Sequence, residues 1–215
     1  MGAVSGVVRM EQKTHWETIY RQKRPGEVSW YQPHLNVALD LLAKAGLSVE
    51  SRIIDVGGGA STLVDDLLAR DVKHVTVLDI SGQALAAAKA RLGEQAKRVT
   101  WIEADITQVP LPNASYDLWH DRAVFHFLTD AEDRRRYVAT MREALKAGGH
   151  AVLATFSLQG PPRCSGLEVV RYSPDTLQVE LGSSFRLVEA VEEDHKTPSG
   201  AVQKFVCAHF QKLAT

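Results

Sequence analysis

The 215-residue sequence is short of the features that mark several protein classes. It contains only two cysteines, Cys164 and Cys207, so it has no disulfide framework of the kind found in small secreted domains. Its 25 lysines and arginines are balanced by 26 aspartates and glutamates, which gives no case for nucleic acid or an anionic membrane as a partner. We therefore expect neither of these partners.

Long apolar runs are also missing. No stretch approaches the ~20 residues that span a bilayer, and the N-terminus lacks the charged-then-apolar pattern of a secretory signal. Together with the low cysteine content, these absences favour a reduced, cytoplasmic protein. The hydrophobic content of 45% is ordinary for a globular chain, and 215 residues suit one full α/β domain better than two.

The most informative stretch is Ile53-Ile54-Asp55-Val56-Gly57-Gly58-Gly59-Ala60-Ser61. Its apolar, β-branched start is typical of a buried strand, its three glycines predict a tight turn, and a helical segment follows from Thr62. Glycines have no Cβ, so backbone amides can approach a ligand, and the helix N-terminus faces that ligand. The stretch therefore predicts a βα turn that binds a phosphate or a nucleoside.

Strand-like and helix-like runs alternate through the rest of the chain. The expected strands are Arg52–Val56, His74–Leu78, Val99–Glu103, Tyr116–Trp119, His150–Phe156, Phe185–Glu193 and Ala201–Phe210. The expected helices are Pro33–Ala45, Ser61–Ala69, Ser81–Leu92, Thr129–Leu145 and Ser173–Leu181. This order predicts an α/β fold: a Rossmann-like, doubly wound, mostly parallel seven-stranded sheet whose C-terminal hairpin adds an antiparallel strand.

Residues 1–34 are expected to form an N-terminal tail and cap segment, and residues 35–215 the main domain. We expect residues 1–10 to be a loose tail, followed by an aromatic-rich helix that Arg24-Pro25-Gly26 breaks. Lys146-Ala147-Gly148-Gly149 predicts the turn that ends the helix Thr129–Leu145. Residues 157–172 are expected to form a loop.

Acidic residues follow the first strands at the edge where open α/β sheets bind ligands. Asp79 lies 22 residues after Gly57 and can accept hydrogen bonds from both hydroxyls of a ribose, or it can share a helix cap with Ser81. Asp105 follows the third strand and can bind an exocyclic amine such as that of adenine, or it is an ordinary surface acid. Asp55 is inside an apolar strand, so it must find a partner, either the glycine turn or an ammonium group of a ligand.

Taken in chain order, these pieces resemble the motifs of the class I S-adenosylmethionine-dependent methyltransferases. The matching segments are Asp55–Ser61, Val77–Ser81, Ala104–Ile106, Leu111–Trp119, Arg122–Leu128 and Leu145–Gly149. Ser61 stands where many members have glycine. The resemblance covers nearly all of the chain and implies the fold described above, S-adenosyl-L-methionine as cofactor, and methyl transfer by in-line displacement.

The resemblance also implies a set of cofactor-binding residues. These are Asp55, Gly57, Gly58, Gly59, Ser61, Asp79, Ile80, Ala104, Asp105, Ile106 and His120, with Tyr20 and Trp30 near the methionine end. A nicotinamide or flavin dinucleotide is the rival ligand for the glycine turn. Its G-x-G-x-x-G pattern fits Gly57 and Gly59 but meets Thr62 in place of the third glycine, and it leaves Asp105 without a role.

The acceptor side is less determined, and three residues are catalytic candidates. Arg122 can clamp a carboxylate or phosphate, or it can form a structural ion pair with Asp121 or a nearby acid. His126 is either a base or a packed histidine. His195, expected in a hairpin connection, is either a substrate contact or a solvated side chain.

Other side chains near the same rim have two interpretations each. Trp16, Tyr20, Trp30 and Tyr31 can form a lid whose aromatic faces suit a sulfonium cation, or they can simply pack the N-terminal segment on the sheet. Cys164 is either a ligand-handling thiol or an inert buried one. Cysteine and histidine do not recur at metal-ligand spacing, so we expect no metal.

We expect an enzyme that methylates a small molecule, because insertions are short and the chain offers no extra domain or basic groove. A protein lysine methyltransferase is the first alternative, since Trp16–Tyr20 resembles that group, although Asp121–Val124 lacks its Asp-Lys-Gly-Thr sequence. The Asp121-Arg122 pair resembles thiol methyltransferases, a second alternative. A cofactor-binding module without catalysis is the non-enzymatic alternative, and the oligomeric state is left open.

Overall fold

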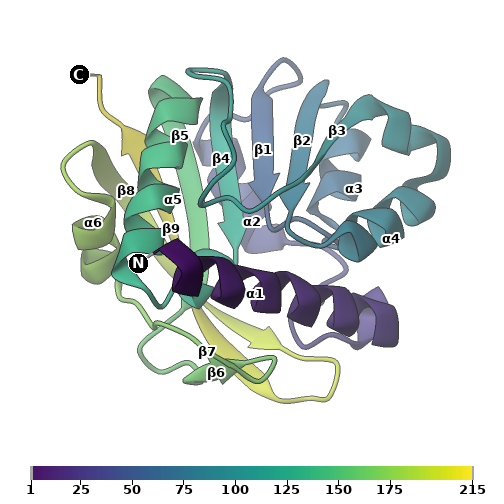
Figure 1. Cartoon of the computed structure of the whole chain (residues 1–215). Helices are drawn as coiled ribbons and strands as arrows, with labels where there is room; N and C mark the ends of the chain where they lie inside the picture. Colours follow the sequence, from purple (N-terminus) through teal and green to yellow (C-terminus); the bar gives the residue numbers. More distant parts are fainter. Residues whose placement is uncertain (1, 215) are drawn as a thin grey trace.

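A computed structural model describes residues 2–214, with side chains from residue 11 onward apart from that of residue 25. Its main sheet has seven strands in the order β3-β2-β1-β4-β5-β9-β8 (Figure 1). These strands are β1 (Arg52–Val56), β2 (His74–Asp79), β3 (Val99–Glu103), β4 (Tyr116–Arg122), β5 (Leu145–Phe156), β8 (Phe185–Lys196) and β9 (Val202–Lys212). Strands β1 to β5 pair in parallel, and β9 runs antiparallel to both of its neighbours. The predicted fold class is confirmed.

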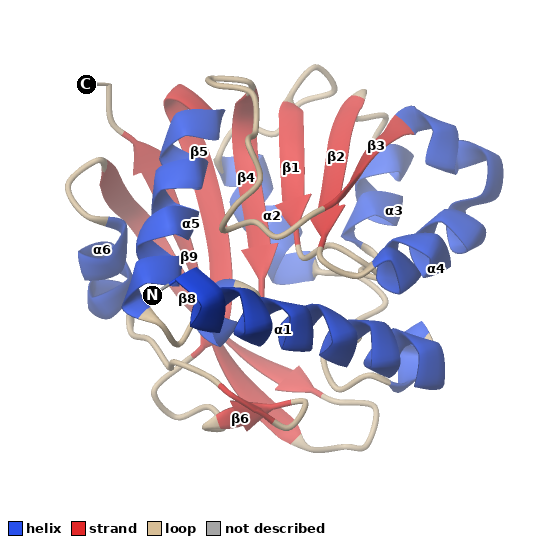
Figure 2. Cartoon of the chain, viewed as in Figure 1, coloured by secondary structure: helices blue, strands red, loops and turns tan. Residues whose placement is uncertain are grey.

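Six α-helices of the described chain accompany the sheet (Figure 2). They are α1 (Gly2–Gln22), α2 (Asn36–Lys44), α3 (Leu63–Ala69), α4 (Gly82–Leu92), α5 (Ala131–Ala144) and α6 (Pro174–Leu181). Three short 3₁₀ turns lie at Pro25–Glu27, Gly93–Arg98 and Phe125–Phe127. No helix within residues 2–214 combines the length and the apolar character that a bilayer crossing requires.

The side-chain alternation of β1 explains why Ile53, Ile54 and Val56 are all apolar. Ile53 packs in a core cluster with α2 and α3, whereas Ile54 and Val56 pack in a second cluster with α5 and α6. A central parallel strand buries both of its faces, so both sets of side chains must be apolar. The same strand ends at the glycine turn, which fixes that turn at the carboxyl edge of the sheet.

Helix starts agree with the capping residues in the sequence. The Ser81 hydroxyl accepts the Ala84 backbone N–H at 3.2 Å, and Asp130 accepts the N–H groups of Glu132 and Asp133. These side chains satisfy backbone donors that have no partner within the first turn of a helix. The local signals therefore placed α4 and α5 correctly.

Three local expectations were wrong. Residues 1–10 were expected as a loose tail, but α1 begins at Gly2. The expected turn at Lys146–Gly149 is part of β5, where the pairing register with β4 shifts between Tyr116 and Leu118. The loop over residues 157–172 contains a small hairpin, β6 (Arg163–Cys164) and β7 (Leu167–Glu168).

Helix α1 crosses the carboxyl end of the parallel strands (Figure 1). Lys13 forms an ion pair with Glu103 at the end of β3. Glu17 accepts the backbone N–H of Gly82 at the start of α4, at 2.7 Å. These contacts hold α1 over the edge of the sheet where ligands bind in open α/β folds.

Candidate functional site

The glycine turn after β1 is packed so closely that it has no room for side chains. Gly57 has φ of +68°, a conformation that favours glycine, and its N–H donates to the Leu78 carbonyl of β2 at 2.7 Å. A Cβ on Gly58 would lie 2.4 Å from Asp55 Oδ2, and one on Gly59 would lie 2.4 Å from Asp79 Oδ2. The turn therefore presents bare backbone beside two carboxylates.

Asp55 and His120 form a buried pair between β1 and β4. The His120 Nδ1–H donates to Asp55 Oδ1 at 2.7 Å, and each residue is only 1% exposed. Asp55 Oδ2 and His120 Nε2 have no hydrogen-bond partner in the structure. Buried polar atoms are normally paired, so these two atoms mark a place where a polar ligand group fits.

The acids that end β2 and β3 have different surroundings. Asp79 is buried and accepts the Ser81 N–H at 2.8 Å, and burial raises its pKa to about 7. Asp105 accepts the backbone N–H and the hydroxyl of Thr107, and Gln108 Nε2 also donates to it. Both residues line the same cavity. Asp79 therefore also forms the cap contact weighed as its alternative role, while its position suits a ribose.

Two adjoining cavities lie at this edge of the sheet. The first encloses about 870 Å³, counting its opening to solvent, and the second about 470 Å³. Tyr20, Trp30, Gly57 and Arg122 line both. The shared residues make the two cavities one continuous candidate site.

The predicted cofactor residues divide between these cavities. Asp79, Ile80, Ala104, Asp105 and Ile106 line the first. Asp55, Gly58, Ser61 and His120 line the second, and Gly57, Tyr20 and Trp30 line both. Gly59 lines neither cavity but presses against the Asp79 carboxylate. Predicted residues from segments far apart in the sequence thus lie around the same two cavities. Their roles in binding a cofactor stay predictions.

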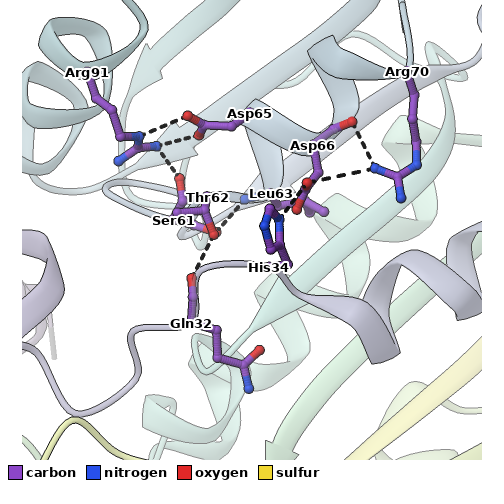
Figure 3. Close-up of polar contacts among 9 residues, drawn as sticks. All are labelled: Gln32, His34, Ser61, Thr62, Leu63, Asp65, Asp66, Arg70 and Arg91. Carbon is purple, nitrogen blue, oxygen red and sulfur yellow. Dashed lines mark hydrogen bonds and ion pairs between the residues drawn. The ribbon is translucent and has the colours of Figure 1, made fainter.

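The outer side of the glycine turn is clamped by distant segments, as Figure 3 shows. The Thr62 hydroxyl donates to the Gln32 carbonyl at 2.8 Å. Arg91 of α4 donates to the Ser61 carbonyl at 2.6 Å and pairs with Asp65 of α3 at 2.7 Å. These contacts fix the turn before any ligand arrives, which lowers the ordering cost of binding.

Aromatic rings roof the first cavity. Trp16 of α1 packs edge-to-face against Trp30 and Phe127, with centroid separations of 5.7 and 5.0 Å. Tyr20 packs against Trp30 at 6.1 Å. Trp16, Tyr20 and Trp30 therefore both pack the N-terminal segment on the domain and face the cavity, so the two interpretations of these residues hold together.

Arg122 ends β4 at the junction of the cavities. Its Nη1 donates to the Trp30 carbonyl at 2.9 Å, and its guanidinium carbon lies 4.5 Å from the centroid of the Phe205 ring. Its Nε and Nη2 atoms are buried without a hydrogen-bond partner. Burial also lowers the pKa of this guanidinium from its usual value. Its expected pairing with Asp121 is absent, because Asp121 accepts from Tyr137 and from backbone N–H groups.

The other two catalytic candidates line neither cavity. His126 Nδ1 accepts the Phe156 N–H at 3.3 Å, and burial lowers its pKa to about 3. His195 lies within β8 rather than in a solvated turn, where its Nε2–H donates to the Ser29 carbonyl at 2.6 Å. Gln32 contacts its Nδ1 at 3.0 Å. Both rings are therefore held in structural contacts.

Val124, Phe127 and Leu167 line the first cavity but had no role assigned from the sequence, whereas Cys164 was weighed as a ligand-handling thiol. Val124 and Phe127 follow β4, and Cys164 and Leu167 come from the β6–β7 hairpin. Burial raises the pKa of the Cys164 thiol to about 11, so it is protonated at neutral pH. No group of three or more metal-ligating side chains is found among the described residues.

Comparisons with known proteins find similarity to methyltransferases. Residues 53–149 match a family model described as a methyltransferase domain. An uncharacterised methyltransferase of Mycobacterium bovis is 31% identical over 57% of this chain, which spans 58% of the length of that protein. The eEF1A lysine and N-terminal methyltransferase of Bos taurus is 26% identical over 63% of this chain and 20% of its own length.

Solved structures show the same fold. The 1,6-didemethyltoxoflavin-N1-methyltransferase of Burkholderia thailandensis, solved with S-adenosylhomocysteine and 1,6-didemethyltoxoflavin, superposes with a TM-score of 0.71 at 17% identity. The match covers 98% of this chain and 89% of that one. The family model and the methyltransferase relatives support the resemblance to the class I S-adenosylmethionine-dependent methyltransferases, and the solved structures share the fold of this chain.

Proposed function

We propose that this protein transfers a methyl group from S-adenosyl-L-methionine to a small-molecule acceptor. The observation that carries the proposal is the continuity of the two cavities through Gly57 and Arg122, beneath the aromatic roof. One cavity offers the groups that an adenosine requires, and the other offers unpaired polar atoms for an amino acid. With the cofactor bound across both cavities, the acceptor would react at the junction between the two cavities.

The residues present fit this cofactor. Asp79 provides the carboxylate for the ribose, and Ile80 and Ile106 provide apolar contacts for the adenine. The unpaired atoms of Asp55 and His120 provide partners for the amino acid end. The bare backbone of the glycine turn lets the cofactor approach without a steric clash. When bound, the cofactor supplies a methyl group activated on a sulfonium.

The contribution of the chain itself is positioning and exclusion of water. Trp16, Trp30 and Phe127 cover the junction with aromatic surface, which suits a sulfonium cation and keeps bulk water out. The clamped glycine turn holds its shape without a ligand. These features allow methyl transfer with little reorganisation of the protein.

The size of the site supports a small acceptor. The first cavity must hold the adenosine as well as the acceptor, within a space of about 870 Å³ that includes its opening to solvent. Helix α1 lies across the entrance, with Gln12, Trp16 and Tyr20 on the cavity wall. A protein lysine is the alternative acceptor, favoured by the likeness to the bovine eEF1A lysine methyltransferase.

We also propose that the protein works in the cytoplasm. Cys164 and Cys207 are both free and buried, as expected for a protein kept in a reducing compartment. Neither nucleic acid nor a membrane is a partner in this proposal.

Calorimetric titration with S-adenosylhomocysteine tests the cofactor assignment. The Asp79→Ala variant should bind about 10- to 150-fold more weakly than wild type, because a charge-assisted hydrogen bond contributes about 1.5–3 kcal/mol. The matched control is Asp40→Ala, which removes an exposed acid of α2 and should bind like wild type. Equal affinity of Asp79→Ala and wild type would contradict the assignment.

Incubation of a cell extract with enzyme and methyl-labelled cofactor tests the acceptor class. We expect label in small solutes and none above background in acid-insoluble protein. Label that accumulates in protein would instead support the lysine alternative.

A further inference from the structure

Resting on the proposed function, we infer that the acceptor enters the site as an anion, with the negative charge on the atom that is methylated. Arg122 is the residue that binds this anion. Two independent features carry the inference: the unpaired donors of Arg122, and the lack of a usable base among the described residues of the acceptor side.

Arg122 is a buried cation with unfilled hydrogen-bonding capacity. One of its nitrogens donates to the Trp30 carbonyl, and its Nε and Nη2 have no partner. Glu193 is near enough to favour the charged guanidinium, but Gln32 Nε2 donates to the Glu193 carboxylate at 2.7 Å. No carboxylate among the described residues forms an ion pair with Arg122. A buried guanidinium gains stability when an anion fills its free donors.

Arg122 lies beside the region where the reaction would take place. The residue lines both cavities, together with Gly57, Tyr20 and Trp30. The sulfonium connects the adenosine to the amino acid end of the cofactor, so it belongs where the two cavities join. A guanidinium and a sulfonium close together repel each other. An anion between them is attracted to both, whereas a cationic acceptor such as an ammonium is repelled by both.

Among the described residues of the acceptor side, no group is left free to remove a proton at neutral pH. His120 Nε2 is unpaired, but His120 lines the second cavity and is assigned to the amino acid end of the cofactor. Burial raises the pKa of Tyr20 above its ordinary range and that of Cys164 to about 11, so both stay protonated. Asp79 belongs to the ribose position, and Asp105 accepts hydrogen bonds from Thr107 and Gln108. The acceptor must therefore arrive deprotonated, because general-base catalysis requires a base within hydrogen-bond reach.

An anionic acceptor needs no such base. A lone pair of its charged atom forms the new bond to the methyl carbon while the carbon–sulfonium bond breaks and leaves its electron pair on sulfur. No proton moves in this step, and charge is neutralised. Phe127, Leu128 and Leu167 make the wall largely apolar, which favours a weakly hydrated anion such as a thiolate over a strongly hydrated one.

A panel of acceptors built on one aromatic ring tests the charge of the nucleophile. The panel comprises the thiol, the carboxylate, the phenol and the primary amine. We expect the thiol to give the highest kcat/KM, with a pH profile that rises through the pKa of the acceptor itself. A more acidic thiol should shift this rise to lower pH by the difference in acceptor pKa. Preferential methylation of the amine would overturn the inference. So would a pH profile of kcat/KM that does not shift with the pKa of the acceptor.

Substitution of Arg122 tests its role. Arg122→Gln should lower kcat/KM for the anionic acceptor about 10- to 100-fold, with S-adenosylhomocysteine affinity within ~3-fold of wild type. Arg122→Lys keeps the charge but loses the planar guanidinium, so its kcat/KM should lie between those of Arg122→Gln and wild type. The matched control is Arg135→Gln, an exposed arginine paired with Glu132 on α5, which should behave like wild type. S-adenosylhomocysteine affinity also verifies that each variant is folded.

Two outcomes would show that Arg122 does not bind the acceptor. If Arg122→Gln weakened S-adenosylhomocysteine but not 5′-methylthioadenosine, the guanidinium would bind the cofactor's carboxylate instead. If Arg122→Gln and Arg122→Lys both matched wild type with the anionic acceptor, it would bind neither ligand. Failure of wild-type protein to bind S-adenosylhomocysteine is a separate result, which would contradict the proposed function itself.

Discussion

The two halves of the site are built in different ways. The cofactor half comes from the ends of β1, β2 and β3, where backbone turns and carboxylates follow directly from short sequence segments. The acceptor half gathers α1, the Trp30 segment, the end of β4 and the β6–β7 hairpin, which are far apart in the sequence. The first half is fixed by the sheet, whereas the second depends on how peripheral segments pack. Acceptor specificity can therefore change without disturbing cofactor binding.

The strongest test of this division is Gly59→Ala, in the cofactor half. The new Cβ would lie 2.4 Å from Asp79 Oδ2 and 2.8 Å from the Ala84 Cβ, which cannot rotate away. We expect S-adenosylhomocysteine to bind about 100-fold more weakly, equivalent to ~2.7 kcal/mol, as measured by calorimetry. The control is Gly26→Ala, where a Cβ meets nothing within 4 Å. Normal binding of S-adenosylhomocysteine by Gly59→Ala would mean that the glycine turn does not take part in binding the cofactor.

Trp16→Ala changes the acceptor half alone. It removes the ring that packs against Trp30 and Phe127 over the cavity. We expect kcat/KM for the acceptor to fall about 10- to 30-fold, because each aromatic pair contributes about 0.5–1.5 kcal/mol beyond buried area. Affinity for S-adenosylhomocysteine should change no more than ~3-fold. Equal losses for both ligands would show that the two halves are coupled.

His126→Gln should leave both halves intact and change only the pH dependence of stability. His126 has a pKa of about 3 in the folded protein and an ordinary one near 6.5 when unfolded. The unfolded state therefore binds more protons between these values, so the free energy of unfolding falls as pH drops below about 6.5. Glutamine does not titrate, so between pH 7.5 and 4.5 the free energy of unfolding of His126→Gln should fall by about 2.7 kcal/mol less than that of wild type.

Urea unfolding at pH 7.5, 6.0 and 4.5 measures this difference. Parallel curves for His126→Gln and wild type would show that the histidine is not the titrating group. At pH 7.5, kcat/KM should stay within ~3-fold of wild type, since the ring lies outside both cavities. A larger loss would restore His126 as a catalytic candidate.

Sequence patterns predicted which residues gather in the proposed cofactor half, because the determinants of that half are local. A glycine triplet after an apolar strand and acids after the next two strands occupy neighbouring positions in any parallel sheet of this order. The end of β4 was less predictable. We expected the strand to stop at Trp119, but it continues through His120 and Asp121 to Arg122. Their partners are remote in the sequence: Asp55 for His120 and Tyr137 for Asp121.

The sequence suggested which segments border the proposed acceptor half, but their contacts could not be predicted for the same reason. Cys164 and Leu167 reach the cavity only because the β6–β7 hairpin folds against it. His195 looked like part of a solvated turn, yet it is 2% exposed and anchors Ser29. In each case a tertiary contact overrides the local pattern, and a single sequence does not reveal such contacts.

The protonated Cys164 has a consequence for the durability of the enzyme. Its sulfur lies on the wall of the cavity in which a methyl donor would react, and a thiolate there would be alkylated in place of the acceptor. With a pKa of about 11, only ~1 thiol in 10,000 is ionised at pH 7, because each pKa unit is a factor of ten. Burial therefore protects the protein from methylating itself.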